Sequence, residues 1–228
     1  MKVRGRVPLG PVWAVAKKDL LLEVRNREIV ISLLVFSGLI FIIFNFAIEL
    51  TSANRDTVGP GVLWVAVAFA SVLGLNRSFI IEKDGNALDG LLLTPVGRDT
   101  ILIGKTVGNF IFMAAALVIL FPVFTALFDV NVLKIEVFVI ALLTILGLAT
   151  VGTMFAALSV NTRAREIMLP VLFLPIAVPI LISAVEGTAR VTEGGGWGDA
   201  LQWIEILAAF DVIFIVAALL TFQFLLED

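Results

Sequence analysis

The sequence contains no cysteine, no histidine and no tyrosine. Without cysteine the chain can form no disulfide, hold no metal through thiolates and offer no thiol nucleophile. Without histidine it lacks the commonest general base and the commonest metal ligand. No base–nucleophile set remains that would serve an enzyme embedded in a membrane. We therefore expect no catalytic residues and no metal site in this chain.

Charged residues are also scarce. They make up 15% of the 228 residues, whereas 60% are hydrophobic and the mean hydropathy is +1.09. This is not the composition of a soluble globular protein. The basic residues form short flanks beside apolar runs instead of one patch, which argues against nucleic acid as a partner.

Six apolar runs are long enough to cross the roughly 30 Å of hydrocarbon in a bilayer, which takes about 20 residues of helix. They lie at residues 29–48, 58–81, 106–128, 137–160, 167–185 and 204–226. We predict an all-α polytopic membrane protein whose residues 1–228 form one transmembrane domain in the lipid bilayer. A cleaved signal peptide is the competing interpretation of the first run, but 28 residues precede that run and its apolar core is too long.

Lysine and arginine are divided unevenly between the two sides that six spans define. The N-terminal segment and the connections after the second and fourth spans hold 13 of the 16 basic residues. The three alternate connections hold one each, at Arg55, Lys134 and Arg190. Because connections rich in lysine and arginine stay in the cytoplasm, we expect both termini to be cytoplasmic.

Residues 11–28 are typical of an amphipathic helix that lies along the cytoplasmic surface of the membrane. Its apolar face is expected to hold Trp13, Ala16, Leu20 and Val24. That face would enter the membrane interface, while the lysines would meet anionic headgroups. The alternative is a basic flank that only sets the topology.

The connection at 82–100 contains a short amphipathic segment with its own start and stop signals. Asn86 can cap its first turn, with Asp89 three residues later as the reciprocal acceptor. Three leucines follow at helical spacing, at Leu88, Leu91 and Leu92. Thr94-Pro95 then ends the segment, because proline cannot continue a helix. A structured segment in a cytoplasmic connection indicates that another protein docks there.

Gly104-Lys105-Thr106 looks like the end of a phosphate-binding loop. The full pattern needs glycine at position 99, where this chain has Asp99. No other nucleotide site occurs, so any ATP that drives this protein must bind to another chain.

Small residues recur at two places in the predicted spans. Gly104 and Gly108 form G-x-x-x-G, and a second row consists of Ala66, Ala70 and Gly74. This spacing lets two membrane helices approach closely. The contact is either between helices of one subunit or between two copies of the chain.

Asp211 is the deepest acidic residue in any predicted span. An ionised carboxylate in hydrocarbon costs several kcal/mol, so Asp211 should face a cavity or a partner, or be protonated. It serves either a substrate pathway or proton coupling, or else a polar contact within the helices or with a partner subunit. Asn76 and Arg77, near the cytoplasmic end of the second span, are further candidates for a pathway or partner contact.

Three prolines interrupt the fifth predicted span, at Pro170, Pro175 and Pro179. Each removes a backbone hydrogen bond, which predicts either a re-entrant or gating element or an ordinary kinked helix. The longest outer connection is expected next, between Glu186 and Trp203. In it, Gly194-Gly195-Gly196 would be a flexible link, and Trp197 and Trp203 would anchor the membrane interface.

Three stretches resemble a known family. They are W-V-A-V-A-F-A-S-V-L-G-L-N-R-S-F at 64–79, E-K-D-G-N-A-L-D-G-L-L-L-T-P-V at 82–96 and P-V-L-F-L-P-I-A-V-P-I-L-I-S-A at 170–184. They look like the B subunit of the cytochrome c maturation haem-export system, and the resemblance covers nearly the whole chain. It implies a permease subunit of an ABC transporter in the bacterial cytoplasmic (inner) membrane. Such a subunit couples ATP hydrolysis by a separate cytoplasmic ATPase to haem export or haem handling.

The resemblance also implies partners and contact residues. Residues 82–100, called the coupling segment below, would dock on the ATPase subunit. The residues that would make this contact are Glu82, Asp84, Asn86, Leu88, Asp89, Leu91, Leu92, Thr94, Pro95 and Arg98. A haem-handling membrane subunit is a further partner, and a second copy of the chain or a different subunit would supply the other membrane half.

Haem iron is bound axially by histidine, cysteine, methionine or tyrosine. This chain offers only four methionines. We therefore expect it to bind no cofactor itself and a partner to hold haem. Two alternatives stay open: an ABC permease that exports another substrate such as a lipid or drug, and an ion-coupled secondary carrier. The carrier would predict buried charged pairs and internal repeats.

Overall fold

The computed structural model describes residues 9–25, 27–48, 55–84, 97–159 and 165–225, and all the regular structure in them is helical. Seven helices are described: α1 (Leu9–Arg25), α2 (Arg27–Ala47), α3 (Arg55–Asp84), α5 (Arg98–Phe128), α6 (Ile135–Ser159), α7 (Arg165–Thr192) and α8 (Trp197–Leu225). Six of these are long and apolar enough to cross a membrane, and they correspond to the six predicted spans. The prediction of an all-α polytopic membrane protein is therefore confirmed.

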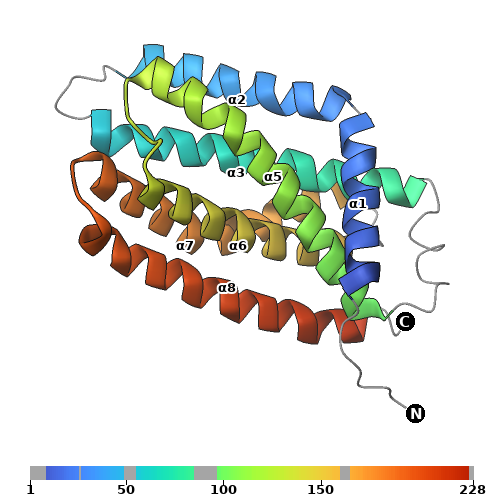
Figure 1. Cartoon of the computed structure of the whole chain (residues 1–228). Helices are drawn as coiled ribbons and strands as arrows, with labels where there is room; N and C mark the ends of the chain where they lie inside the picture. The colour runs from blue at the N-terminus through green and yellow to red at the C-terminus, as the bar shows by residue number, and fades with distance from the viewer. Residues whose placement is uncertain (1–8, 26, 49–54, 85–96, 160–164, 226–228) are drawn as a thin grey trace.

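The six long helices lie alongside one another, and α1 crosses one end of the bundle (Figure 1). α3 and α6 form its centre, because 72% and 67% of the residues in their spans are buried. The corresponding share is 17% in both α2 and α8, which lie at the edges. The outward side chains of these edge helices are apolar, as expected for helices that face lipid instead of water.

Aromatic rings and a side-chain hydrogen bond join the helices inside the bundle. The rings of Phe41 on α2 and Phe124 on α5 meet edge to face, with centroids 5.4 Å apart. Trp64 on α3 is fully buried, and its indole Nε1 donates a hydrogen bond of 3.0 Å to Thr188 Oγ1 on α7. A buried indole N–H needs such a partner. This bond therefore fixes where α3 and α7 cross.

The turn between α7 and α8 is much shorter than the sequence predicts. The expected loop between Glu186 and Trp203 is wrong, because helix occupies all of that stretch except residues 193–196. Gly194 has a φ of 103°, and the N–H of Gly195 donates to the carbonyl of Arg190 at 2.9 Å. This is the Schellman arrangement that ends a helix at a left-handed glycine. The glycines thus define a tight turn instead of a flexible link.

α8 begins directly after that turn. The Asp199 side chain accepts a hydrogen bond of 3.3 Å from the backbone N–H of Gly196, just before the helix starts. An acidic side chain in the first turn also suits the positive end of the helix dipole. Trp197, predicted to lie in a loop, is the first residue of α8 and is half-exposed.

α7 is one helix through all three of its prolines, and its apolar span runs over residues 169–192. It extends along the bundle from one end to the other (Figure 1). The re-entrant interpretation is therefore wrong, since a re-entrant segment returns to the side from which it started. The Ser183 hydroxyl donates to the carbonyl of Pro179 at 2.9 Å.

The end of the bundle away from α1 is held by polar contacts between helix ends and the connections of other helices. Arg55 Nη1 lies 2.7 Å from Asp129 Oδ2, and Lys134 Nζ donates to the carbonyl of Val191 at 2.6 Å. The hydroxyl of Thr57 donates to Glu193 Oε1 at 2.6 Å. Arg55 and Lys134 are two of the three basic residues on the predicted outer side, so most of its positive charge is already engaged within the chain.

Candidate functional site

α3 ends and α5 begins at the end of the bundle that α1 crosses, and these two helix ends flank the predicted coupling segment (Figure 1). Glu82 and Asp84 lie in the last turn of α3, and Arg98 is the first residue of α5. The other residues predicted to contact an ATPase lie outside the described residues: Asn86, Leu88, Asp89, Leu91, Leu92, Thr94 and Pro95. Asn76 and Arg77 belong to the second half of α3.

α1 packs directly on α5 at the two glycines of the G-x-x-x-G motif. A Cβ atom at Gly104 would lie 2.7 Å from the Cβ of Val15 and 3.0 Å from the carbonyl oxygen of Val12. A Cβ atom at Gly108 would lie 3.4 Å from the Cβ of Asp19. At Gly104 only glycine lets the two helices approach this closely, whereas a Cβ atom at Gly108 would make an ordinary contact. Of the two alternatives for this motif, contact within one subunit is thus the one observed.

The face that α1 buries against the bundle shares only part of the face predicted to enter the membrane interface. Val12, Val15 and Ala16 are buried against the bundle, whereas Trp13 and Leu21 are more than half exposed. Of the residues predicted to share one apolar face, only Ala16 is buried, Leu20 is half-buried, and the side chain of Val24 lies outside the description. The helix does cross the bundle end, as a helix lying along a membrane surface would.

The same contact buries charged side chains. Lys105 Nζ on α5 lies 3.5 Å from Asp19 Oδ2 on α1, and these side chains are only 2% and 6% exposed. Lys18 Nζ lies 3.0 Å from the other carboxylate oxygen of Asp19, and Glu23 is buried one turn further along α1. Sequence reasoning missed this group. The available signal was two acidic residues four positions apart, in line with Val12, Val15 and Ala16.

Asp211 lies on α8 where this helix meets α6 and α7. It is 3% exposed, and neither carboxylate oxygen has a hydrogen-bond partner among the described residues. A Cβ atom at Gly147 of α6 would lie 2.7 Å from Asp211 Oδ1 and 2.9 Å from Ile180 Cδ1 of α7. Glycine at position 147 therefore leaves the space that the carboxyl group fills. A role for Asp211 in a pathway or in proton coupling stays a prediction.

The lack of a hydrogen-bond partner for Asp211 among the described residues leads to a testable prediction about stability. Replacing Asp211 with leucine removes a buried polar group that makes no hydrogen bond to the part of the chain that the structure describes, so the fold should be unchanged or about 1–2 kcal/mol more stable. Asp211→Asn is the isosteric comparison, because it keeps a polar group of the same size. Thermal unfolding of the detergent-solubilised chain measures both. A clear loss of stability in Asp211→Leu would show that the carboxyl group has a partner.

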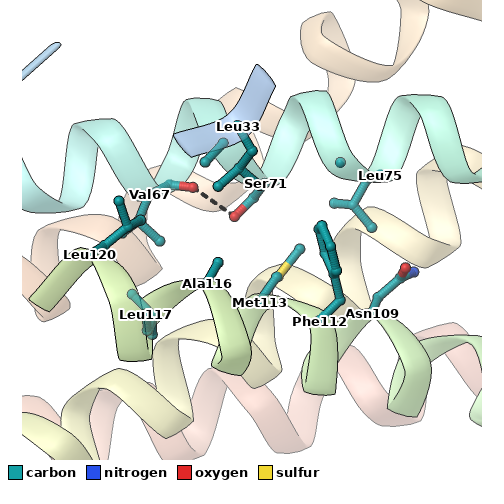
Figure 2. A pocket seen from close by; sticks show the side chains of 12 residues that line it. Leu33, Val67, Ser71, Leu75, Asn109, Phe112, Met113, Ala116, Leu117 and Leu120 are labelled. Carbon is teal, nitrogen blue, oxygen red and sulfur yellow. Dashed lines mark hydrogen bonds between the residues drawn. The ribbon is translucent and has the colours of Figure 1, made fainter. Parts of the chain in front are cut away.

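An apolar pocket lies between α2, α3 and α5 (Figure 2). Two polar side chains line it, and both are already engaged: Ser71 donates to the carbonyl of Val67 at 2.7 Å, and Asn109 donates to Thr153 on α6 at 2.9 Å. Met113 also lines the pocket and has the thioether that could bind haem iron. The lining holds no charged side chain for haem propionates, so the pocket is a poor fit for haem.

Comparison with known proteins places the whole bundle in one family. The chain matches the family described as CcmB protein over residues 11–225, from within α1 to the last residue of α8. It is 27% identical to Heme exporter protein B of Pseudomonas aeruginosa over 179 residues, which cover 77% of this chain and 79% of that protein.

Two further relatives carry the same description. Identity to Heme exporter protein B of Rhodobacter capsulatus is 31% over 140 residues, which cover 60% of this chain and 63% of that protein. Identity to Heme exporter protein B of Escherichia coli is 27% over 173 residues, which cover 75% and 79%.

Proposed function

Because the chain belongs to the CcmB protein family, we propose that it is the permease subunit of an ABC transporter that exports or handles haem for the maturation of c-type cytochromes. The match over residues 11–225 carries this proposal, and relatives described as Heme exporter protein B support it. ATP is hydrolysed by a separate cytoplasmic subunit. This chain supplies membrane helices that the ATPase moves.

The mechanism begins at the coupling segment. An ATPase that closes on ATP displaces this segment, and the displacement enters the bundle through α3 and α5, the two helices that flank it. α3 is bonded to α7 through Trp64 and Thr188, and α5 is bonded to α6 through Asn109 and Thr153. A displacement at one end therefore reaches the centre of the bundle. Such a cycle requires two states in which the helices make different contacts.

The orientation follows from the uneven distribution of basic residues. The connections with 13 of the 16 lysines and arginines would face the cytoplasm of a bacterium, where the ATPase binds. The start of α1 and the end of α8 lie at the same end of the bundle as the end of α3 and the start of α5 (Figure 1), which agrees with two cytoplasmic termini. Haem is held by a partner subunit in the inner membrane, because this chain has no histidine, cysteine or tyrosine to ligate it.

Deleting the gene tests the proposal against export of another substrate. We expect the deletion strain to lose mature c-type cytochromes, seen as covalent haem on gels, while b-type cytochromes remain. Expressing the chain from a plasmid should restore them. Normal c-type cytochromes in the deletion strain would contradict haem export and favour a lipid or drug exporter. A purified complex without vanadate-sensitive ATPase activity would favour the ion-coupled carrier.

A further inference from the structure

The contact between α1 and α5 contains a buried ion pair, which close packing of two helices does not require. Replacing a buried ion pair with apolar side chains of similar size is often neutral or stabilising, whereas removing one partner is strongly destabilising. Lys105 and Asp19 are nonetheless both buried here, beside two glycines that already bring the helices together. What the ion pair adds is a fixed register, because Lys105 has to stay opposite Asp19.

The position of this contact links three elements. Lys105 lies two turns after the start of α5 at Arg98, and the last residues of the coupling segment form the first turn of α5. α1 ends at Arg25 and α2 begins at Arg27, so α2 follows α1 with one residue between them. α2 is also one of the two least buried long helices. It therefore has few contacts to break if it moves.

We propose that α1 and α5 move as one body, joined by Lys105, Asp19, Gly104 and Gly108, and that this body carries α2 when the ATPase displaces the coupling segment. Lys105 is then a positioning residue for the transport cycle. The inference rests on the proposed function for its driving force. It adds a second way for movement of the ATPase to reach α2, an edge helix, without passing through the centre of the bundle.

Distances between spin labels test the movement in the intact complex with its ATPase. The chain has no cysteine of its own, so labels attach only where cysteine is introduced. One pair, Ile43→Cys on α2 and Val212→Cys on α8, joins two exposed sites on the edge helices. A second pair, Leu21→Cys on α1 and Val118→Cys on α5, joins exposed sites on the two helices that should move together.

We expect the α2–α8 distance to differ between the nucleotide-free complex and the complex trapped with ATP and vanadate. The α1–α5 distance should be the same in both states. These measurements keep Lys105 and Asp19 unchanged, so they do not depend on how a charge variant folds. A change in the α1–α5 distance, or an unchanged α2–α8 distance, would overturn the proposal.

Charge variants then test Lys105 itself. Lys105→Met should abolish the α2–α8 change and reduce c-type cytochromes to the level of the deletion strain, while the exchanged pair Asp19→Lys with Lys105→Asp should restore part of both. Lys17→Met is the matched control, because Lys17 is an exposed lysine on α1, the helix that carries Asp19. A normal α2–α8 change in Lys105→Met would contradict the proposal.

The two proposals fail in different ways. If the deletion strain makes normal c-type cytochromes, the proposed function is wrong, whatever the labels show. If the deletion strain loses them but the label distances contradict the expectation, only the inference about α1, α5 and α2 is wrong.

Discussion

Aspartate in place of both Leu91 and Leu92 is expected to abolish copurification of the ATPase with this chain. These leucines are the predicted apolar contact of the coupling segment. Two unpaired carboxylates buried in such a contact would cost about 2–3 kcal/mol each, which weakens binding by roughly three orders of magnitude or more. Affinity purification of the tagged chain from native membranes, followed by immunoblotting for the ATPase, measures the loss.

A matched pair of substitutions at the other end of the bundle serves as the control. Leu133 lies between α5 and α6, Ile135 is the first residue of α6, and each is 61% exposed. Leu133→Asp with Ile135→Asp introduces the same two charges on the predicted outer side, so the ATPase should still copurify. If the Leu91 and Leu92 variant also retains the ATPase, the docking contact lies elsewhere on the chain.

Gly152→Leu is expected to destabilise the bundle more than Gly147→Leu, the same change at the other glycine of α6. A Cβ atom at Gly152 would overlap the side chain of Leu75 on α3, and Leu75 is itself 1% exposed. Because neither helix can yield without disturbing the centre of the bundle, the free energy of unfolding should fall by about 3 kcal/mol or more. Thermal unfolding in detergent micelles measures the difference.

Gly38→Leu is the control for Gly152→Leu. Gly38 also lies within an apolar helix, α2, but a Cβ atom there would meet nothing within 4 Å. The same substitution should therefore leave the unfolding temperature unchanged or slightly higher, because leucine favours helix over glycine. Equal losses in the two variants would show that the contact between Gly152 and Leu75 is not what limits stability.

The six long helices could be predicted from sequence because lipid imposes a strong condition on composition. A run of about 20 apolar residues is hard to explain in any other way. The helix ends could not be predicted from the same signal. α3 continues to Asp84 and α7 to Thr192, because a helix can extend beyond the hydrocarbon wherever its backbone bonds remain satisfied.

The face of α1 and the partner of the G-x-x-x-G motif could not be derived from sequence. The spacing of apolar residues indicates that a helix has a buried side, but lipid and protein can both cover it. Two glycines indicate a close approach without naming the second helix. Asp19 and Lys105 are far apart in the chain, so only the fold brings their charges together. The predicted contacts of the coupling segment stay predictions.

The turn after α7 was predictable in principle. A glycine at the C-terminus of a helix is a recognised stop signal, and an acidic residue three positions into the next helix is a recognised start signal. Gly194 and Asp199 carry these two signals. A prediction based on hydropathy alone missed these two signals, because Glu186 and Arg190 lower the mean hydropathy of the last turns of α7.

The burial of Trp64 makes this protein a natural fluorescence probe. The chain has four tryptophans and no tyrosine, so its near-ultraviolet emission comes from indole rings alone. Trp13 and Trp197 are about half exposed, and quenchers in the solvent or in lipid reach them. Trp64 is shielded between α3 and α7. Its emission therefore reports when these two helices separate, without any added dye.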